Sequence, residues 1–236
     1  MKDVSRYAVV RLWLSDRPGS LGQIASMVGE IGADLVGIDI LERDGARAVD
    51  ELTLELPAGY DPDDLVFALS QIAGVEVEDL RHLVSRPTSA GCDPLDVAVS
   101  LVESTGADEL ATALISGVSA ALNCEWCTMS ERRSNAVKVL AKIGNAPSAA
   151  WLDEFVIDAE DSSSRAGAGL VGPRDIAWAP LPSSDLVLVA GRDGPPFRRR
   201  EREQLHQLSR IADARWLELT SADTGSVSPF ENVGGE

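Results

Sequence analysis

The sequence has little of what most catalytic and metal-binding sites are made from. Its 236 residues include only two histidines and three cysteines. Two histidines leave little choice of a general base. An odd and small number of cysteines points to a reducing compartment rather than to a disulfide framework. We therefore expect a cytoplasmic protein.

Long apolar runs and positive charge are also scarce. No stretch approaches the roughly 20 apolar residues that a membrane-spanning helix needs. The opening MKDVSRYAVVRLWLSD is interrupted by charges and lacks a cleavage pattern, so it predicts a strand rather than a signal peptide. The formal net charge of -17 opposes binding to nucleic acid or an anionic membrane, because the summed field repels phosphates. A small zwitterion is compatible with this charge.

Motifs for common chemistries are missing as well. The sequence has no Walker-type phosphate loop, no G-x-S-x-G elbow and no His-Glu metal helix. Cys124 and Cys127 form a lone C-x-x-C without a second ligand pair, so buried small side chains are favoured over a metal or redox site. We expect no catalytic residue, no metal and no cofactor.

What is present is the composition of a globular protein, with 44% hydrophobic and 25% charged residues. The length favours two domains, and the Pro- and Gly-containing stretch SRPTSAGCDP predicts a boundary between them. The predicted order is a first domain over 1–86, a linker over 87–94, a second domain over 95–220 and a disordered tail over 221–236.

The first domain shows the pattern strand, helix, strand, strand, helix, strand. Apolar residues alternate in the predicted strands and recur every three or four residues in the helices. The predicted strands cover 7–14, 35–42, 49–56 and 75–83, and the helices cover 21–31 and 61–74. This order predicts a ferredoxin-like α+β fold with a four-stranded antiparallel sheet. Arg11 should then face an acidic residue of the third strand. The apolar Trp13 side chain on the same side should need other side chains to cover it.

The loop between the first strand and the first helix has two interpretations. Ser20 and Gln23 form a capping-box signature, which is typical of an ordinary turn into a helix. The same loop can instead hold a small ligand. Backbone N–H groups at a helix start bind carboxylates, and Asp16 and Asp34 could flank the same spot and receive an ammonium. The second interpretation describes a site for an α-amino acid.

A family resemblance bears on this choice. Residues 7–83, with DRPGSL in the first loop and GADL before the second strand, resemble an ACT domain, a regulatory module that binds amino acids. The resemblance implies a ligand held where the first loop of one module meets the second strand of another, and hence a homodimer or a larger assembly. The implied ligand-binding residues are Asp16, Arg17, Pro18, Gly19, Ser20, Leu21, Asp34 and Leu35.

The second domain is also predicted to be α+β. Helical patterns over 95–104 and 107–122 precede four short strands, 158–173 predicts a mobile surface loop, and a helix follows Phe197. The long helix before the first strand and the ending DLVLVAGRDGPPFRRREREQLHQLSRIADARWLEL resemble a divergent GAF domain. The arginines of its basic cluster alternate with glutamates, so a solvated face is favoured over a phosphate site, and docking to an acidic surface stays open.

Together these features predict a non-catalytic regulatory protein. It would bind a free amino acid through the ACT-like domain and pass the signal to the GAF-like domain or to a partner protein. The alternatives are an assembly subunit without a ligand and an enzyme that uses a GAF-like cleft.

Overall fold

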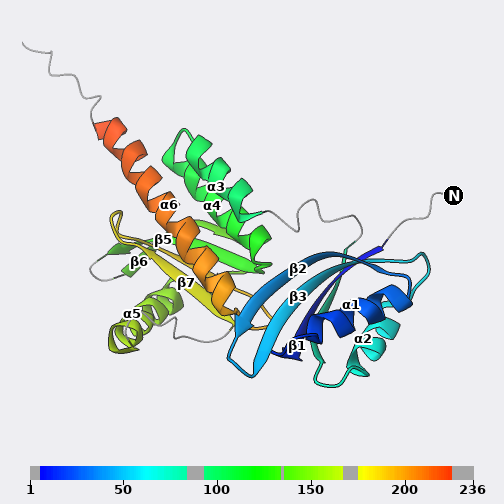
Figure 1. Ribbon diagram of the computed structural model, residues 1–236. Coiled ribbons are helices and arrows are strands. Elements are labelled where there is room, and N and C mark those ends of the chain that lie inside the picture. Colours follow the sequence, from blue (N-terminus) through cyan, green and yellow to red (C-terminus); the bar gives the residue numbers. More distant parts are fainter. Residues whose placement is uncertain (1–5, 84–92, 134–135, 167–174, 225–236) are drawn as a thin grey trace, which may run out of the picture. The chain divides into compact units, whose positions relative to one another are not determined.

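The computed structural model describes residues 6–83, 93–133, 136–166 and 175–224 (Figure 1). Its contacts divide the chain into two units, Met1–Cys92 with Asp193–Glu203 and Asp93–Arg192 with Gln204–Glu236. The segment 193–203, predicted to belong to the second domain, makes its contacts with the first unit. Most of the predicted linker and tail lies outside the described residues, but 221–224 are helical.

The first unit has the predicted order of elements. They are β1 (Arg6–Ser15), α1 (Ser20–Glu30), β2 (Asp34–Arg43), β3 (Arg47–Leu56), α2 (Pro62–Ser70) and β4 (Glu76–Leu83). The strands form one antiparallel sheet in the order β2-β3-β1-β4. The first and third strands are therefore neighbours, which confirms the predicted ferredoxin-like fold.

One face of this sheet packs against both helices. The alternating apolar residues of β1 and β3 share a buried cluster with apolar residues of α1 and α2. The members from β1 and the two helices are Ala8, Val10, Leu12, Leu14, Ile24, Val28, Leu65 and Leu69. Both helices consequently cover the same face, as Figure 1 shows, and we call the opposite side the helix-free face.

Local signals in the sequence explain where these elements begin and end. The Asp61 side chain accepts a hydrogen bond from the Asp63 N–H, and Pro62 occupies the first turn of α2. α2 ends at Ser70, earlier than the predicted residue 74. Between β2 and β3, Asp44 Oδ1 accepts the N–H groups of Ala46 and Arg47 at 3.2 and 2.8 Å, as expected for a turn.

The second unit contains a separate antiparallel sheet in the order β6-β5-β8-β7. Its elements are α3 (Pro94–Glu103), α4 (Ala107–Ala121), β5 (Trp126–Arg133), β6 (Ala136–Ile143), α5 (Ala149–Ala166), β7 (Ile176–Leu181), β8 (Leu186–Gly191) and α6 (Arg199–Thr224). α6 begins in the segment 193–203 and continues into this unit. All four predicted strands are present, so the α+β prediction for this half is confirmed.

One expectation for the second unit is wrong. The predicted surface loop over 158–173 begins inside α5, which extends to Ala166, and 167–173 lie outside the described residues. Leu152, Val156 and Ala159 are buried at the three- and four-residue spacing of a helix face. The small polar residues that follow them suggested a loop, but this buried stripe explains why the segment starts as a helix.

Candidate functional site

The predicted binding loop joins β1 to α1 through a tight turn. The Asp16 N–H donates to the Ala46 carbonyl at 3.0 Å, which holds the loop beside the hairpin between β2 and β3. Gly19 has a φ of 92°, in the left-handed region that favours glycine. Gly19, not Ser20, caps α1, and no side chain caps the helix. The predicted capping box of Ser20 and Gln23 is therefore wrong, because Ser20 is buried inside the first turn.

The start of α1 offers unused hydrogen-bond donors. The Ser20 N–H donates to the Arg17 carbonyl at 3.3 Å, but the N–H groups of Leu21 and Gly22 have no backbone acceptor within the described residues. The first turn of α1 also contains no acidic side chain that could accept hydrogen bonds from these N–H groups. Such N–H groups, together with the helix dipole, favour an anion. A carboxylate from outside the protein would supply the missing acceptor.

The two carboxylates that were predicted to flank one spot lie at opposite ends of the sheet. Asp16 Oδ2 is 3.9 Å from Nε of Arg43, at the end of β2. Asp34 begins β2 and pairs with Glu55, near the start of β1. The ten residues of β2 separate the two ends by about 30 Å at about 3.3 Å per residue. The idea that Asp16 and Asp34 of one copy flank the same spot is therefore wrong.

The remaining predicted residues divide into two groups. Arg17 and Pro18 are exposed in the loop, where their side chains can reach a bound molecule. Leu35, by contrast, is partly buried and packs against the core of the first unit. It therefore contributes to the sheet face that carries the helices.

The structure adds a residue that the sequence analysis missed. Asp50 of β3 pairs with Leu12 of β1 and is only 1% exposed. Its Oδ1 atom has no hydrogen-bond partner. Burial is the largest cause of the raised pKa of Asp50, about 6; the Arg43 charge lowers this pKa and the Asp16 charge raises it. A carboxylate at an inward position of an otherwise apolar strand face was the signal in the sequence.

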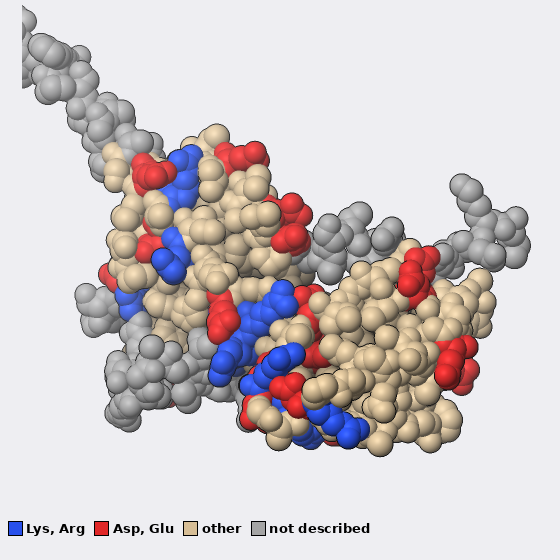
Figure 2. Space-filling view, viewed as in Figure 1, with Lys and Arg blue, Asp and Glu red and all other residues tan. Residues whose placement is uncertain are grey.

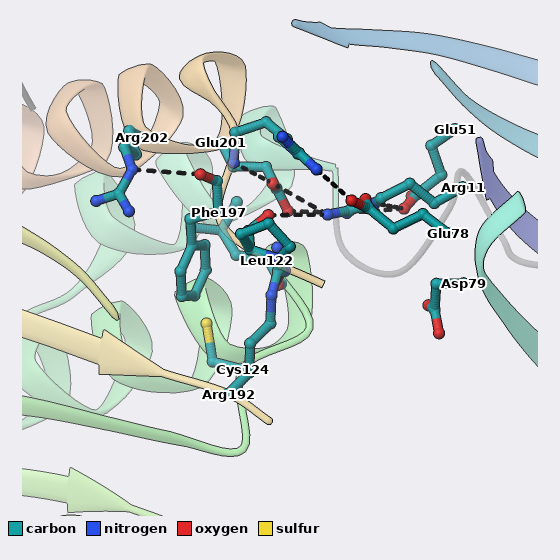
Figure 3. Close-up of polar contacts among 12 residues, drawn as sticks. Arg11, Glu51, Glu78, Asp79, Leu122, Cys124, Arg192, Phe197, Glu201 and Arg202 are labelled. Carbon is teal, nitrogen blue, oxygen red and sulfur yellow. Dashed lines mark hydrogen bonds and ion pairs between the residues drawn. The ribbon is translucent and has the colours of Figure 1, made fainter. Parts of the chain in front are cut away.

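The helix-free face carries a buried ion-pair network. Arg11 is 3% exposed, and its Nη2 atom lies 2.9 Å from Glu51 Oε2 and 3.0 Å from Glu201 Oε1 (Figure 3). Arg81 Nη2 contacts the same Glu51 oxygen at 2.7 Å. The predicted pairing of Arg11 with an acidic residue of the third strand is confirmed. Glu201, in the segment 193–203, was not foreseen.

The same segment covers Trp13. The guanidinium of Arg198 lies 4.6 Å from the centroid of the Trp13 ring, and the indole N–H donates to Glu78 at 3.2 Å. Arg198 also forms ion pairs with Glu78 and with Glu42, the latter at 3.2 Å. The prediction of a solvated basic face is wrong for Arg198, which is buried because it contacts acidic side chains of the sheet.

The outer surface of α1 is nearly free of charge. Gly22, Ala25, Ser26 and Gly29 are exposed, and Glu30 is the only charged residue of the helix. Figure 2 shows an uncharged surface over α1 and a gathering of basic and acidic side chains toward the β2–β3 hairpin. Small side chains of this kind allow close approach of a second helix.

The C-x-x-C pair does not have the properties of a reactive site. Cys127 is completely buried, and desolvation raises the pKa of its thiol well above the ordinary value. A nucleophilic or redox cysteine needs a shift in the opposite direction. Within the described ranges, no three His, Cys, Asp or Glu side chains are grouped to hold a metal ion. None of the helices in those ranges is long and apolar enough to cross a membrane.

Comparison with known proteins finds similar solved structures of two kinds. No protein-family model matches the sequence, and no curated protein matches it. The ACT domain of a GTP pyrophosphokinase from Chlorobium tepidum matches 34% of this chain and 86% of its own, with 16% identity and a TM-score of 0.26. The GAF domain of an Acinetobacter phosphoenolpyruvate-protein phosphotransferase matches 58% of this chain and 95% of its own, with 12% identity and a TM-score of 0.39.

A putative glycine cleavage system transcriptional repressor also matches, over 69% of this chain and 94% of its own, with 10% identity and a TM-score of 0.29. Both units are α+β with a four-stranded antiparallel sheet, and the similar solved structures include ACT and GAF domains. The element order of the first unit and the adjacency of its first and third strands agree with those predicted from the sequence. At these identities and TM-scores, the likenesses supply no argument about ligand, activity or partner.

Proposed function

We propose that this protein is a non-catalytic, cytoplasmic sensor that binds a free amino acid through its ACT-like unit. The observation that carries the proposal is the pair of unused N–H groups, on Leu21 and Gly22, at the start of the helix that follows the loop of Asp16. A zwitterion combines the two charges that these groups favour. Its carboxylate would accept from the helix start, and its ammonium would contact an acidic side chain.

The energetics require more than one exposed contact. A surface ion pair contributes about 0 to 1 kcal/mol, whereas millimolar to micromolar binding needs roughly 4 to 8 kcal/mol. Several charge-assisted hydrogen bonds, each about 1.5 to 3 kcal/mol, supply that range when water is excluded. An open loop provides too few of them, so the site needs cover.

A second copy of the chain would provide this cover. Asp34 is about 30 Å along β2 from the loop of its own copy at about 3.3 Å per residue, so it could reach a ligand only from a partner. The uncharged outer surface of α1 suits contact between two copies. We therefore propose a homodimer through the ACT-like units. Ala25→Arg, which places a charge on the exposed side of α1, should yield a monomer in sedimentation equilibrium.

Transmission would follow the chain from the segment 193–203. This segment is held on the helix-free face by ion pairs of Arg198 and Glu201, and it leads directly into α6. A ligand that changes the sheet would change these contacts and hence the start of α6. Such a response requires the amino acid to bind one state better than the other.

A thermal-shift panel of the twenty common amino acids tests the proposed function. A ligand at about 100 times its dissociation constant adds roughly 2.7 kcal/mol of stability, which is a shift of several degrees. Asp16→Ala should weaken the response, while Asp158→Ala, an exposed change on α5, should preserve it. A dimer that responds to no amino acid would contradict the proposal and favour the assembly subunit.

A further inference from the structure

Asp50 is an anomaly in the core of the first unit. It occupies the same strand face as Ala48, Leu52 and Leu54, all of which are buried in the cluster beneath the helices. Its Oδ1 atom is buried and has no hydrogen-bond partner among the described residues. A leucine would suit this position far better, because a buried charge without a partner is strongly unfavourable.

Asp50 lies toward the end of the sheet that carries the β1–α1 loop, since it pairs with Leu12 near the end of β1. The charges that act on it are those of Asp16, in the β1–α1 loop, and Arg43, at the end of β2. Arg43 is 56% exposed and lies 3.9 Å from Asp16. Arg43 therefore pairs with Asp16 and acts on the buried Asp50 only as a nearby charge. Asp50 also faces the helix layer, in which α1 begins directly after this loop.

We propose that Asp50, assisted by Asp16, binds the ammonium group of the amino acid whose carboxylate is held by the N–H groups of Leu21 and Gly22. This inference rests on the proposed function and makes it more specific. Both charged ends of the ligand are then bound within one copy, and Asp34 of a second copy acts mainly as cover. The unpartnered carboxylate is a cost that the bound ammonium removes.

The site predicts a preference in ligand chemistry. A primary ammonium donates up to three hydrogen bonds and carries the charge that Asp50 lacks. An N-acetylated amino acid has the carboxylate but no ammonium, so it should bind poorly. Methylammonium has the ammonium alone, so it should bind weakly but depend on the same residue. These two compounds separate the two halves of the site.

The experiment measures thermal shifts of the full chain with the twenty amino acids, their N-acetyl derivatives and methylammonium chloride. Asp50→Asn should weaken binding of the active amino acid by about 10-fold or more, the equivalent of one charge-assisted hydrogen bond. Asp158→Asn, on the exposed side of α5, is the control and should change affinity by less than about threefold. The Asp50→Asn variant should melt no lower than the wild type.

The outcomes distinguish a failure of the ammonium subsite from a failure of the proposed function. If an amino acid binds Asp50→Asn as tightly as the wild type, the ammonium subsite is refuted and the proposed function stands. If methylammonium stabilises only proteins that keep Asp50 and no amino acid binds, the subsite stands and the proposed function fails. If none of these compounds stabilises the wild type, both fail.

A measurement on the wild type covers the case in which Asp50→Asn does not fold. Ammonium binding requires the ionised carboxylate of Asp50, whose pKa is about 6. The affinity for the active amino acid should therefore fall about 10-fold as the pH decreases from 7 to 5. The other charged groups that act on Asp50 are Arg43 and Asp16. An affinity that does not change with pH would overturn the inference.

Discussion

Replacing Asp50 by asparagine should change how stability depends on pH. Burial raises the pKa of this carboxyl from 3.8 to about 6. A shift of about two pKa units corresponds to about 3 kcal/mol. Because the folded pKa is higher than the unfolded one, the folded state binds the proton more tightly. The free energy of unfolding should therefore fall as the pH rises from about 4 to about 6.

The difference between the wild type and Asp50→Asn isolates this effect, since the other acidic groups are common to both proteins. Urea unfolding at pH 4 and at pH 7.5 should show that the variant gains up to about 3 kcal/mol relative to the wild type between the two values. Asp158→Asn, on the exposed side of α5, should show no comparable gain. A difference that is the same at both pH values would refute the argument, because it would mean that Asp50 ionises without cost.

Three further predictions concern other parts of the chain. Arg11→Ala should lower the free energy of unfolding by about 3 to 5 kcal/mol, since it removes the buried guanidinium that pairs with Glu51 and Glu201; urea unfolding measures this, and a loss below about 1 kcal/mol would contradict it. Gly19→Ala should cost about 1 to 2 kcal/mol at a φ of 92°, whereas Gly22→Ala, with open space around its Cβ, should cost less. Cys127 should resist iodoacetamide until the protein unfolds, as measured by mass spectrometry, because its thiol is buried and its pKa is raised; rapid native labelling would show that the burial is wrong.

The sheet of the first unit was predictable because local patterns and global packing agree. The alternation in β1 places Leu12 and its even-numbered neighbours in the core and Arg11 on the other face, and the pairing with Glu51 follows from the strand order. Gly32 lies in the left-handed region just after α1, a conformation that commonly ends a helix. The hydrophobic period and the turn residues that predict these elements involve residues only a few positions apart in the sequence.

Contacts between distant residues were less accessible from the sequence. Arg198 is about 120 residues from Glu78, and nothing in its basic, glutamate-rich neighbourhood indicates burial against the β-sheet. Its position depends on the fold of the complete first unit. The cluster therefore resembled a solvated helix face, although the structure shows a buried contact with acidic residues.

The candidate site was also only partly predictable. The loop residues Asp16 and Gly19 followed from local chemistry, but local chemistry could not show that Asp34 lies at the far end of the sheet. The alternation of β3 predicts a strand with or without Asp50, so this pattern alone does not mark the residue. The positions of Asp34 and Asp50 both follow from the pairing register of the sheet, which the composition does not reveal.

Titration calorimetry of the full chain with an equimolar mixture of the twenty common amino acids tests the central claim most directly. The account predicts a saturable heat in the wild type that is strongly reduced in Asp50→Asn and preserved in Asp158→Asn. A wild-type titration that shows only the heat of dilution would contradict the claim that the ACT-like unit binds a free amino acid.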